Sequence, residues 1–268
     1  MLKELTFGYS PCPNDTFMFN AIASGRVTVP DCRITPVLHD VETLNHMAVT
    51  GELDVTKLSF YAWLKARERY ALLGSGAAMG FGCGPVLIAS KKIDRADIGR
   101  CRVVLPGRLT TAHLLFKLWA PHNEQRRFIP YDQIFDALIS GRADCGVIIH
   151  ESRFTFESAG FKPVVDLGAW WEEKTGLPIP LGGIAARKDL QPRLIDNINA
   201  AVNTSIRQAM DDPKATLPYI RQYAQEMGDA ILQAHIRTFV NDFSLKLGPA
   251  GYRAIDKLDA MAREAGVL

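Results

Sequence analysis

The sequence has no excess of one charge, no long apolar run and no regular cysteine pattern, and each absence excludes a class of protein. Its 31 basic and 29 acidic residues give a net charge of only +2 over 268 residues. Nucleic acids and anionic membranes both require a concentrated basic face, so we expect neither as a partner. No apolar run is long enough to span a bilayer, and the N-terminus "MLKELTFGYS" lacks the features of a secretory signal.

The five cysteines argue against a disulfide framework or a metal site. Their number is odd, and they show neither a CxxC pair nor the Cys and His spacing of a zinc site. We therefore expect reduced thiols, no metal and a cytoplasmic location. Cys12 is interpreted as a small packing residue rather than a reactive thiol, and it stays open whether Cys12 or Cys83 lines a pocket. P-loop, GxSxG, HExxH and strand-borne GxGxxG motifs are also missing.

Strand and helix patterns alternate along the chain, which predicts an α/β protein with largely parallel sheets. One series of alternating patterns runs from residue 5 to residue 70, and a second runs from residue 102 to residue 150. Between them lies a glycine-rich stretch, "LLGSGAAMGFGCGP", that is too rich in glycine for a helix. From residue 191 onward the pattern is almost wholly helical.

A short internal similarity predicts that the two series form similar lobes. "MAVTGELDVTKLS" and "LISGRADCGVIIH" both read helix, glycine, two residues, aspartate and apolar strand. Gly51 therefore corresponds to Gly141, and Asp54 corresponds to Asp144. Each copy comes third in its own run of alternating strands and helices.

Two such lobes would share a ligand site. Ligands of open parallel sheets bind outside the carboxyl ends of the strands, so facing lobes would place Ser59 and His150 on one cleft. We expect the chain to cross between lobes near residues 86 and 182, so that residues 1–86 and 182–268 form lobe I and residues 87–181 form lobe II. Two crossings would form a hinge that closes on a ligand.

His150 is the strongest candidate for a catalytic group because it directly follows the apolar strand "CGVII". An imidazole titrates near neutral pH and can act as a general base. Glu151 or Asp144 could orient the ring, although neighbours on a strand point to opposite faces. The other histidines lack such a context and are interpreted as surface or packing residues: His39, His46, His113, His122 and His235.

Two predicted helix starts follow strand ends and could bind an anion. In "LPGRLTTAH", free amides at Thr111 and Ala112 could hold a carboxylate or phosphate. Thr110 or Thr111 as a plain N-cap is the alternative. "SPCPNDTF" repeats the arrangement in the first lobe, with Asn14 or Asp15 as the cap.

Seven motifs, in order, resemble those of the 1,4-dihydroxy-6-naphthoate synthases of the futalosine route to menaquinone. They are "YSPCPNDTFMF", "DVETLN", "TKLSF", "PGRLTTA", "GVIIHESRFT", "DLGAWWEEKTGLPIPLGGI" and "VNDFSL", and they extend from Tyr9 to Leu245. The resemblance implies a two-lobed fold like that of type-two periplasmic binding proteins, acting as a lyase in the cytoplasm without a cofactor. The implied reaction converts cyclic dehypoxanthine futalosine to 1,4-dihydroxy-6-naphthoate by carbon–carbon cleavage, with release of a sugar-derived fragment.

The resemblance also implies roles for residues at matching positions. "TKLS" and "RLTTA" match segments that contact the substrate, whose carboxylate suits the helix start at Thr111 and Ala112. "IIHES" makes His150 the proton acceptor. Ser10, Asn14 and Asp40 are expected at the site because they lie at strand ends that face the cleft. The expected substrate-binding residues are therefore Ser10, Asn14, Asp40, Lys57, Leu58, Ser59, Thr110, Thr111 and Ala112.

Two other functions are compatible with the same fold. A non-catalytic small-molecule binding protein would share it, because a fold does not determine function, although the missing signal sequence argues against an exported receptor. Chorismate dehydratase of the same pathway is the closest enzymatic alternative and is expected to lack "GVIIHESRFT". The sequence leaves open whether the protein is a monomer or a homodimer, how far the lobes close, and which group returns a proton to the leaving fragment.

Overall fold

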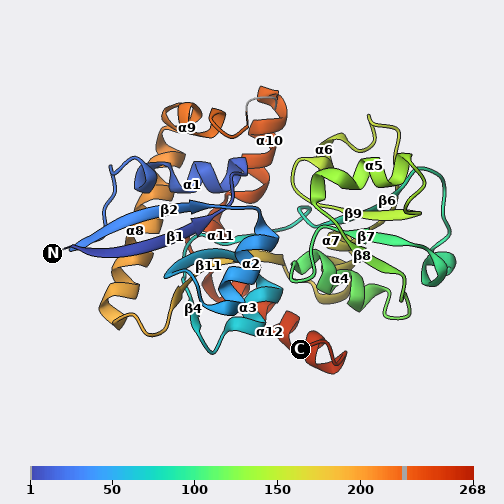
Figure 1. Ribbon diagram of the computed structural model, residues 1–268, viewed down its shortest axis with the longest axis horizontal. Helices are drawn as coiled ribbons and strands as arrows, with labels where there is room; N and C mark the ends of the chain where they lie inside the picture. Colours follow the sequence, from blue (N-terminus) through green and yellow to red (C-terminus); the bar gives the residue numbers. More distant parts are fainter. Residues whose placement is uncertain (1, 225–227) are drawn as a thin grey trace.

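The structure is a computed structural model that describes residues 2–224 and 228–268, and its strands form two separate sheets (Figure 1). Helices cover both sheets, so the predicted α/β class is confirmed. The first sheet has the order β2 (Cys32–Leu38), β1 (Lys3–Tyr9), β3 (Val55–Ser59), β11 (Ile179–Arg187) and β4 (Tyr70–Leu72), with β5 (Ala78–Gly80) paired to β11. The second has the order β10 (Lys162–Asp166), β6 (Val86–Ala89), β9 (Cys145–Ile148), β7 (Val103–Leu105) and β8 (Arg126–Phe128).

The helices lie between strands in the first two thirds of the chain and follow one another in the last third. None within the described residues is long and apolar enough to cross a membrane. In chain order they are α1 (Pro13–Ala23), α2 (Val41–Thr50), α3 (Phe60–Ala66), η1 (Arg95–Arg100), α4 (Thr111–Trp119), η2 (Tyr131–Gln133), α5 (Ile134–Ile139), α6 (Ser152–Thr155), α7 (Leu167–Thr175), α8 (Pro192–Asp211), η3 (Pro213–Thr216), α9 (Leu217–Arg221), α10 (Asp229–Phe239), α11 (Asp242–Leu245) and α12 (Gly248–Glu264).

The sheets are more evenly mixed than the sequence predicts. Among the described strands, four of the nine pairings are parallel: β1 with β2 and β3, and β7 with β8 and β9. The five antiparallel pairings all involve β6 or β11. These two strands follow the segments that cross between the sheets, and they enter their sheets in the opposite direction to the parallel strands beside them.

The chain crosses between the sheets twice, at residues 81–85 and 176–178. An apolar cluster extends across the junction, since Phe60 of the first lobe and Leu105 and Leu114 of the second belong to the same core together with Trp171 and Leu258. The lobes are therefore packed against one another over buried apolar surface. Their division at residues 86 and 182 stays a prediction.

The internal similarity in the sequence corresponds to one local design used in both lobes. Gly51 and Gly141 both have positive φ, 82° and 68°, which ends the preceding helix in the left-handed conformation that glycine tolerates. Asp54 then accepts from the backbone amide of Thr6 at 2.9 Å, and Asp144 accepts from that of Arg102 at 2.8 Å. In each lobe the aspartate ties the start of the third strand to the strand beside it.

One carboxylate from the first lobe binds backbone amides of the second. Glu42, on α2, accepts from the Arg108 amide at 2.5 Å and from the Leu109 amide at 3.0 Å. Burial raises the pKa of Glu42, while the Leu109 and Arg108 amides act in the opposite direction because they stabilise the charged form. Gly107 makes this approach possible, since a Cβ there would lie only 2.4 Å from Glu42 Oε2.

We expect Gly107→Ala to lower the free energy of unfolding by about 1.5–3 kcal/mol, the usual worth of hydrogen bonds to a charged group, because the new methyl group displaces Glu42 from both amides. Gly99→Ala is the matched control, because a Cβ at Gly99 meets nothing within 4 Å. Urea denaturation of both variants measures the difference. Equal stability of the two variants would contradict the role assigned to Glu42.

Candidate active site

A cavity between the two sheets is lined by residues of both lobes and encloses about 730 Å³, part of it open to solvent. Nine of the ten residues predicted for the site line the cavity: Ser10, Asn14, Lys57, Leu58, Ser59, Thr110, Thr111, Ala112 and His150.

The tenth predicted residue, Asp40, is not among the residues that line this cavity. It is the N-cap of α2, where its carboxylate accepts from the amides of Glu42 at 3.0 Å and Thr43 at 3.1 Å. A strand end followed by a helix requires a cap, and Asp40 fills that structural role.

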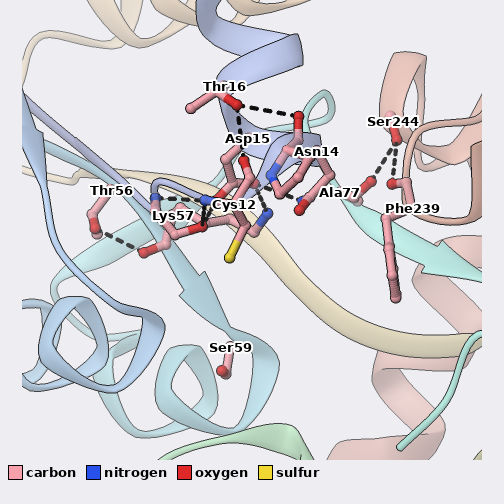
Figure 2. Close-up of polar contacts among 12 residues, drawn as sticks. Cys12, Asn14, Asp15, Thr16, Thr56, Lys57, Ser59, Ala77, Phe239 and Ser244 are labelled. Atoms are coloured by element: carbon pink, nitrogen blue, oxygen red, sulfur yellow. Dashed lines mark hydrogen bonds and ion pairs between the residues drawn. The ribbon is translucent and has the colours of Figure 1, made fainter. Parts of the chain in front are cut away.

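A buried ion pair lies at one wall of the cavity (Figure 2). Lys57 Nζ is 2.5 Å from Asp15 Oδ1, with side-chain exposures of only 7% and 2%. Asp15 also accepts from the Ser10 amide and hydroxyl at 3.1 and 2.6 Å and from Asn14 Nδ2 at 2.9 Å. The prediction of Asn14 or Asp15 as the cap of α1 is wrong: Cys12 is the N-cap, because the proline that follows it fits the first helical turn.

The start of α4 lies at another wall. Thr110 is its N-cap and accepts from the His113 amide at 3.2 Å, while the Thr111 hydroxyl donates to the Leu181 carbonyl of β11 at 2.7 Å. The amides of Thr111 and Ala112 lie in the first turn, where a helix has free donors and a partial positive charge. An anion in the cavity would be stabilised there.

Ser59 is held in place by a neighbouring amide side chain. Its hydroxyl accepts from Asn45 Nδ2 at 3.1 Å, and its backbone N–H donates to Asn45 Oδ1 at 2.8 Å. Asn45 is fully buried on α2 and therefore fixes the end of β3 at the cavity wall.

His150 lies just beyond β9 with φ 55°, an uncommon left-handed conformation for a residue with a side chain. Cys12 Sγ is 3.7 Å from its Nδ1, and the Tyr131 ring packs edge-on with 5.1 Å between centroids. Burial lowers the pKa of this imidazole, but Cys12, followed by Glu151 and Asp15, outweighs burial and raises the pKa to about 9. The expected titration near neutral pH is therefore shifted upward.

The sequence left a choice between two cysteines, and they occupy different places. Cys83 lines the cavity, and burial raises its pKa to about 12, so it is a thiol at neutral pH. Cys12 lines an outer cleft together with Glu151 and Tyr131. Cys12 therefore lines the outer cleft and also contacts His150, which lines the cavity.

Three polar residues at or beside the cavity were not predicted: Asp15, Arg153 and His235. Arg153 lines the cavity near the first crossing, donating to the Gly84 carbonyl at 2.5 Å and to Asp166 Oδ2 at 2.6 Å. Asp15 lies in the first turn of α1, where the sequence predicted only a cap, and His235 comes from α10 far along the chain. No strand end marks the position of His235 in the sequence.

The fold is that of periplasmic binding proteins. A solved structure described as a Candida albicans gene product with the generic periplasmic binding protein fold matches with a TM-score of 0.73 at 16% identity, over 100% of this chain and 91% of that one. A family model for menaquinone biosynthesis matches residues 5–264, and the chain belongs to this family.

Two curated relatives carry the name 1,4-dihydroxy-6-naphthoate synthase. The protein from Thermus thermophilus is 46% identical over 99% of this chain and 96% of its own length. The protein from Streptomyces coelicolor is 42% identical over 98% of this chain and 94% of its own length. The resemblance predicted from seven motifs is confirmed.

We expect Lys57→Met to lower the free energy of unfolding by about 3–5 kcal/mol, because it leaves the Asp15 carboxylate buried without its cation. Lys91→Met at the exposed surface should stay within about 0.5 kcal/mol of the wild type. Chemical denaturation of the two variants measures both values. A loss below about 1 kcal/mol for Lys57→Met would show that Asp15 does not depend on Lys57.

Proposed function

We propose that this protein converts cyclic dehypoxanthine futalosine to 1,4-dihydroxy-6-naphthoate, with His150 as the proton acceptor. The identity of 46% to a synthase over nearly the full length carries the proposal. The geometry supports it, because His150 from the second lobe and Lys57 and Ser59 from the first line the same cavity.

In the proposed reaction the first-turn amides of α4 hold the aryl carboxylate of the substrate, and residues from the end of β3 contact the rest of the molecule. His150 takes a proton from a sugar-derived hydroxyl, the ring opens, and a carbon–carbon bond breaks as the bicyclic system becomes aromatic. Positioning and one base are sufficient, since aromatisation supplies driving force. We expect no cofactor, because no step passes electrons to an acceptor.

The names of the relatives favour a synthase over chorismate dehydratase or a binding protein without activity. The proposed partner is a small molecule that carries a carboxylate. A cytoplasmic location, the absence of nucleic-acid and membrane partners, and a monomeric or homodimeric state stay predictions.

We expect His150→Ala to lower kcat by at least about a hundredfold while the substrate still binds, since general bases usually contribute that much. The assay supplies the cyclic futalosine derivative without a cofactor and follows formation of the naphthoate. Binding of the substrate to the variant is measured by calorimetry. Activity within about tenfold of the wild type would rule out a general-base role for His150.

The raised pKa of His150 predicts the pH dependence of the reaction. A base must be unprotonated to act, and kcat/KM reports the free enzyme, so kcat/KM should rise with pH, with a midpoint near pH 9 and a plateau about one pH unit above it. Cys12→Ala removes the main cause of the raised pKa and leaves burial, which lowers it. The midpoint should then move down by about one pH unit or more.

Cys101→Ala, at a partly exposed cysteine outside the cavity, is the control and should leave the midpoint in place. A wild-type midpoint near the ordinary histidine value of about 6.5, or a midpoint that Cys12→Ala does not move, would contradict this account of His150.

A further inference from the structure

His235 is a fully buried histidine that the proposed mechanism does not use. It lies on α10 with 0% of its surface exposed, and its ring is parallel to that of His150, with 6.1 Å between centroids and 7° between planes. Phe239, which lines the cavity, packs against it at 4.8 Å. Burying an imidazole is unfavourable unless its nitrogens are paired, so its hydrogen bonds indicate its role.

Asn14 determines which nitrogen of His235 carries a hydrogen. Asn14 Nδ2 donates to Asp15 Oδ1 at 2.9 Å, and this fixes the amide orientation because a carboxylate only accepts (Figure 2). Asn14 Oδ1 then faces His235 Nε2 at 2.9 Å and must accept. Nε2 therefore carries a hydrogen, and in the neutral ring Nδ1 is a free acceptor.

His235 Nδ1 has no hydrogen-bond partner within the part of the chain that the structure describes. Glu151 Oε2 lies 3.9 Å away, so two acceptors face one another. They can bond only when one proton lies between them. Burial, followed by the charges of His150 and Lys57, lowers the pKa of His235, so this position is unprotonated at neutral pH.

Glu151 follows His150 in the chain and its side chain is 27% exposed, whereas His235 is fully buried beside both residues. His150 lines the cavity that holds the substrate, whereas Glu151 lines the outer cleft. A proton on His150 cannot leave through the cavity while the substrate fills it. Besides Cys12 Sγ, which is 3.7 Å from His150 Nδ1, the acceptors near His150 are the Glu151 carboxylate and the free nitrogen of His235, which lie 3.9 Å from one another.

We propose that His235 is a positioning residue that acts through Glu151 and His150: its Nδ1 and the Glu151 carboxylate together accept the proton that His150 takes from the substrate. This inference rests on the proposed function.

The protons balance along this path. An O–H bond of the substrate breaks as an N–H bond forms on His150, and that N–H bond breaks as the proton passes to the Glu151–His235 pair. The pair loses the proton to water in the outer cleft, and the leaving fragment takes one proton from water. The titratable and charged groups that face the two histidines are Cys12, Asp15, Lys57, Tyr131 and Glu151.

His235→Gln tests the proposal, because glutamine can still donate to Asn14 but has no titratable nitrogen. We expect kcat of this variant to be at least about tenfold below the wild-type value. KM should stay within about threefold of the wild-type value, since His235 does not line the cavity. At fixed pH and ionic strength, kcat of the variant should rise with the concentration of imidazole buffer, which accepts the proton from the outer cleft. Wild-type kcat should not depend on the buffer.

His113→Gln is the matched control. His113 is also a buried histidine, with Nδ1 on the Arg108 carbonyl at 2.7 Å, but it does not face His150. We expect this variant to lose stability and to keep a kcat that is independent of buffer. The proposal requires that the wild type turns over the substrate and that His235→Gln is slower and responds to buffer. It would be overturned if kcat of His235→Gln stays within about twofold of the wild-type value, or if that kcat does not respond to buffer.

A second measurement needs neither a variant nor turnover. Nitrogen NMR of the wild type labelled at histidine should show His235 as the neutral Nε2–H tautomer from about pH 6 to about pH 9. A doubly protonated ring or an Nδ1–H tautomer would overturn the role of His235 and leave the proposed function intact. Failure of wild-type turnover would instead contradict the proposed function, while the NMR result still decides whether Nδ1 is a free acceptor.

Discussion

The Asp15 carboxylate is buried between the helix that carries it and the end of β3, and four donors make its charge stable there. Lys57 Nζ, Asn14 Nδ2 and the amide and hydroxyl of Ser10 all point at it. A buried carboxylate without such donors would be strongly destabilising. The same bonds fix the positions of three residues that line the cavity, so the ion pair sets the shape of the wall contributed by the first lobe. They also orient the Asn14 amide, and through it the proton on His235.

The second lobe reaches this wall through contacts that hold the two sheets in one arrangement. β11 supplies the Leu181 carbonyl to the Thr111 hydroxyl, and Glu42 holds the loop before α4. The start of α4 and the end of β3 therefore face the same space because side chains and strands from both lobes bind them. Neither lobe alone contains an anion-binding helix start, a buried lysine and His150 together. The proposed binding of one substrate by both lobes requires this interface.

Strand ends were the reliable guide in the sequence. The rule that ligands bind beyond the carboxyl ends of strands predicted Ser59 and His150 at one cavity, and the helix start after a strand predicted Thr111 and Ala112. The same rule also predicted Asp40, which does not line the cavity and whose carboxylate caps a helix. Residues within helices carry no such mark: His235 reaches the site through the packing of α10, which periodicity alone does not orient. The antiparallel direction of β6 and β11 was also missed, because strand direction depends on the path of the crossings and not on local pattern.

His150 and His235 have parallel rings that lie close together, but their surroundings shift their pKa values in opposite directions. His235 is fully buried and His150 is partly buried, and burial disfavours a charged ring in each. Cys12 and two carboxylates face His150, and their effect outweighs burial and raises its pKa. The positive charges of His150 and Lys57 lie near His235, and their effect adds to burial and lowers its pKa. The higher pKa makes His150 the stronger base of the two, in keeping with its proposed role as the first acceptor of the proton. Because a proton on His150 makes protonation of His235 alone less favourable, Glu151 must neutralise the charge as the proton moves, and its position beside both histidines meets that requirement.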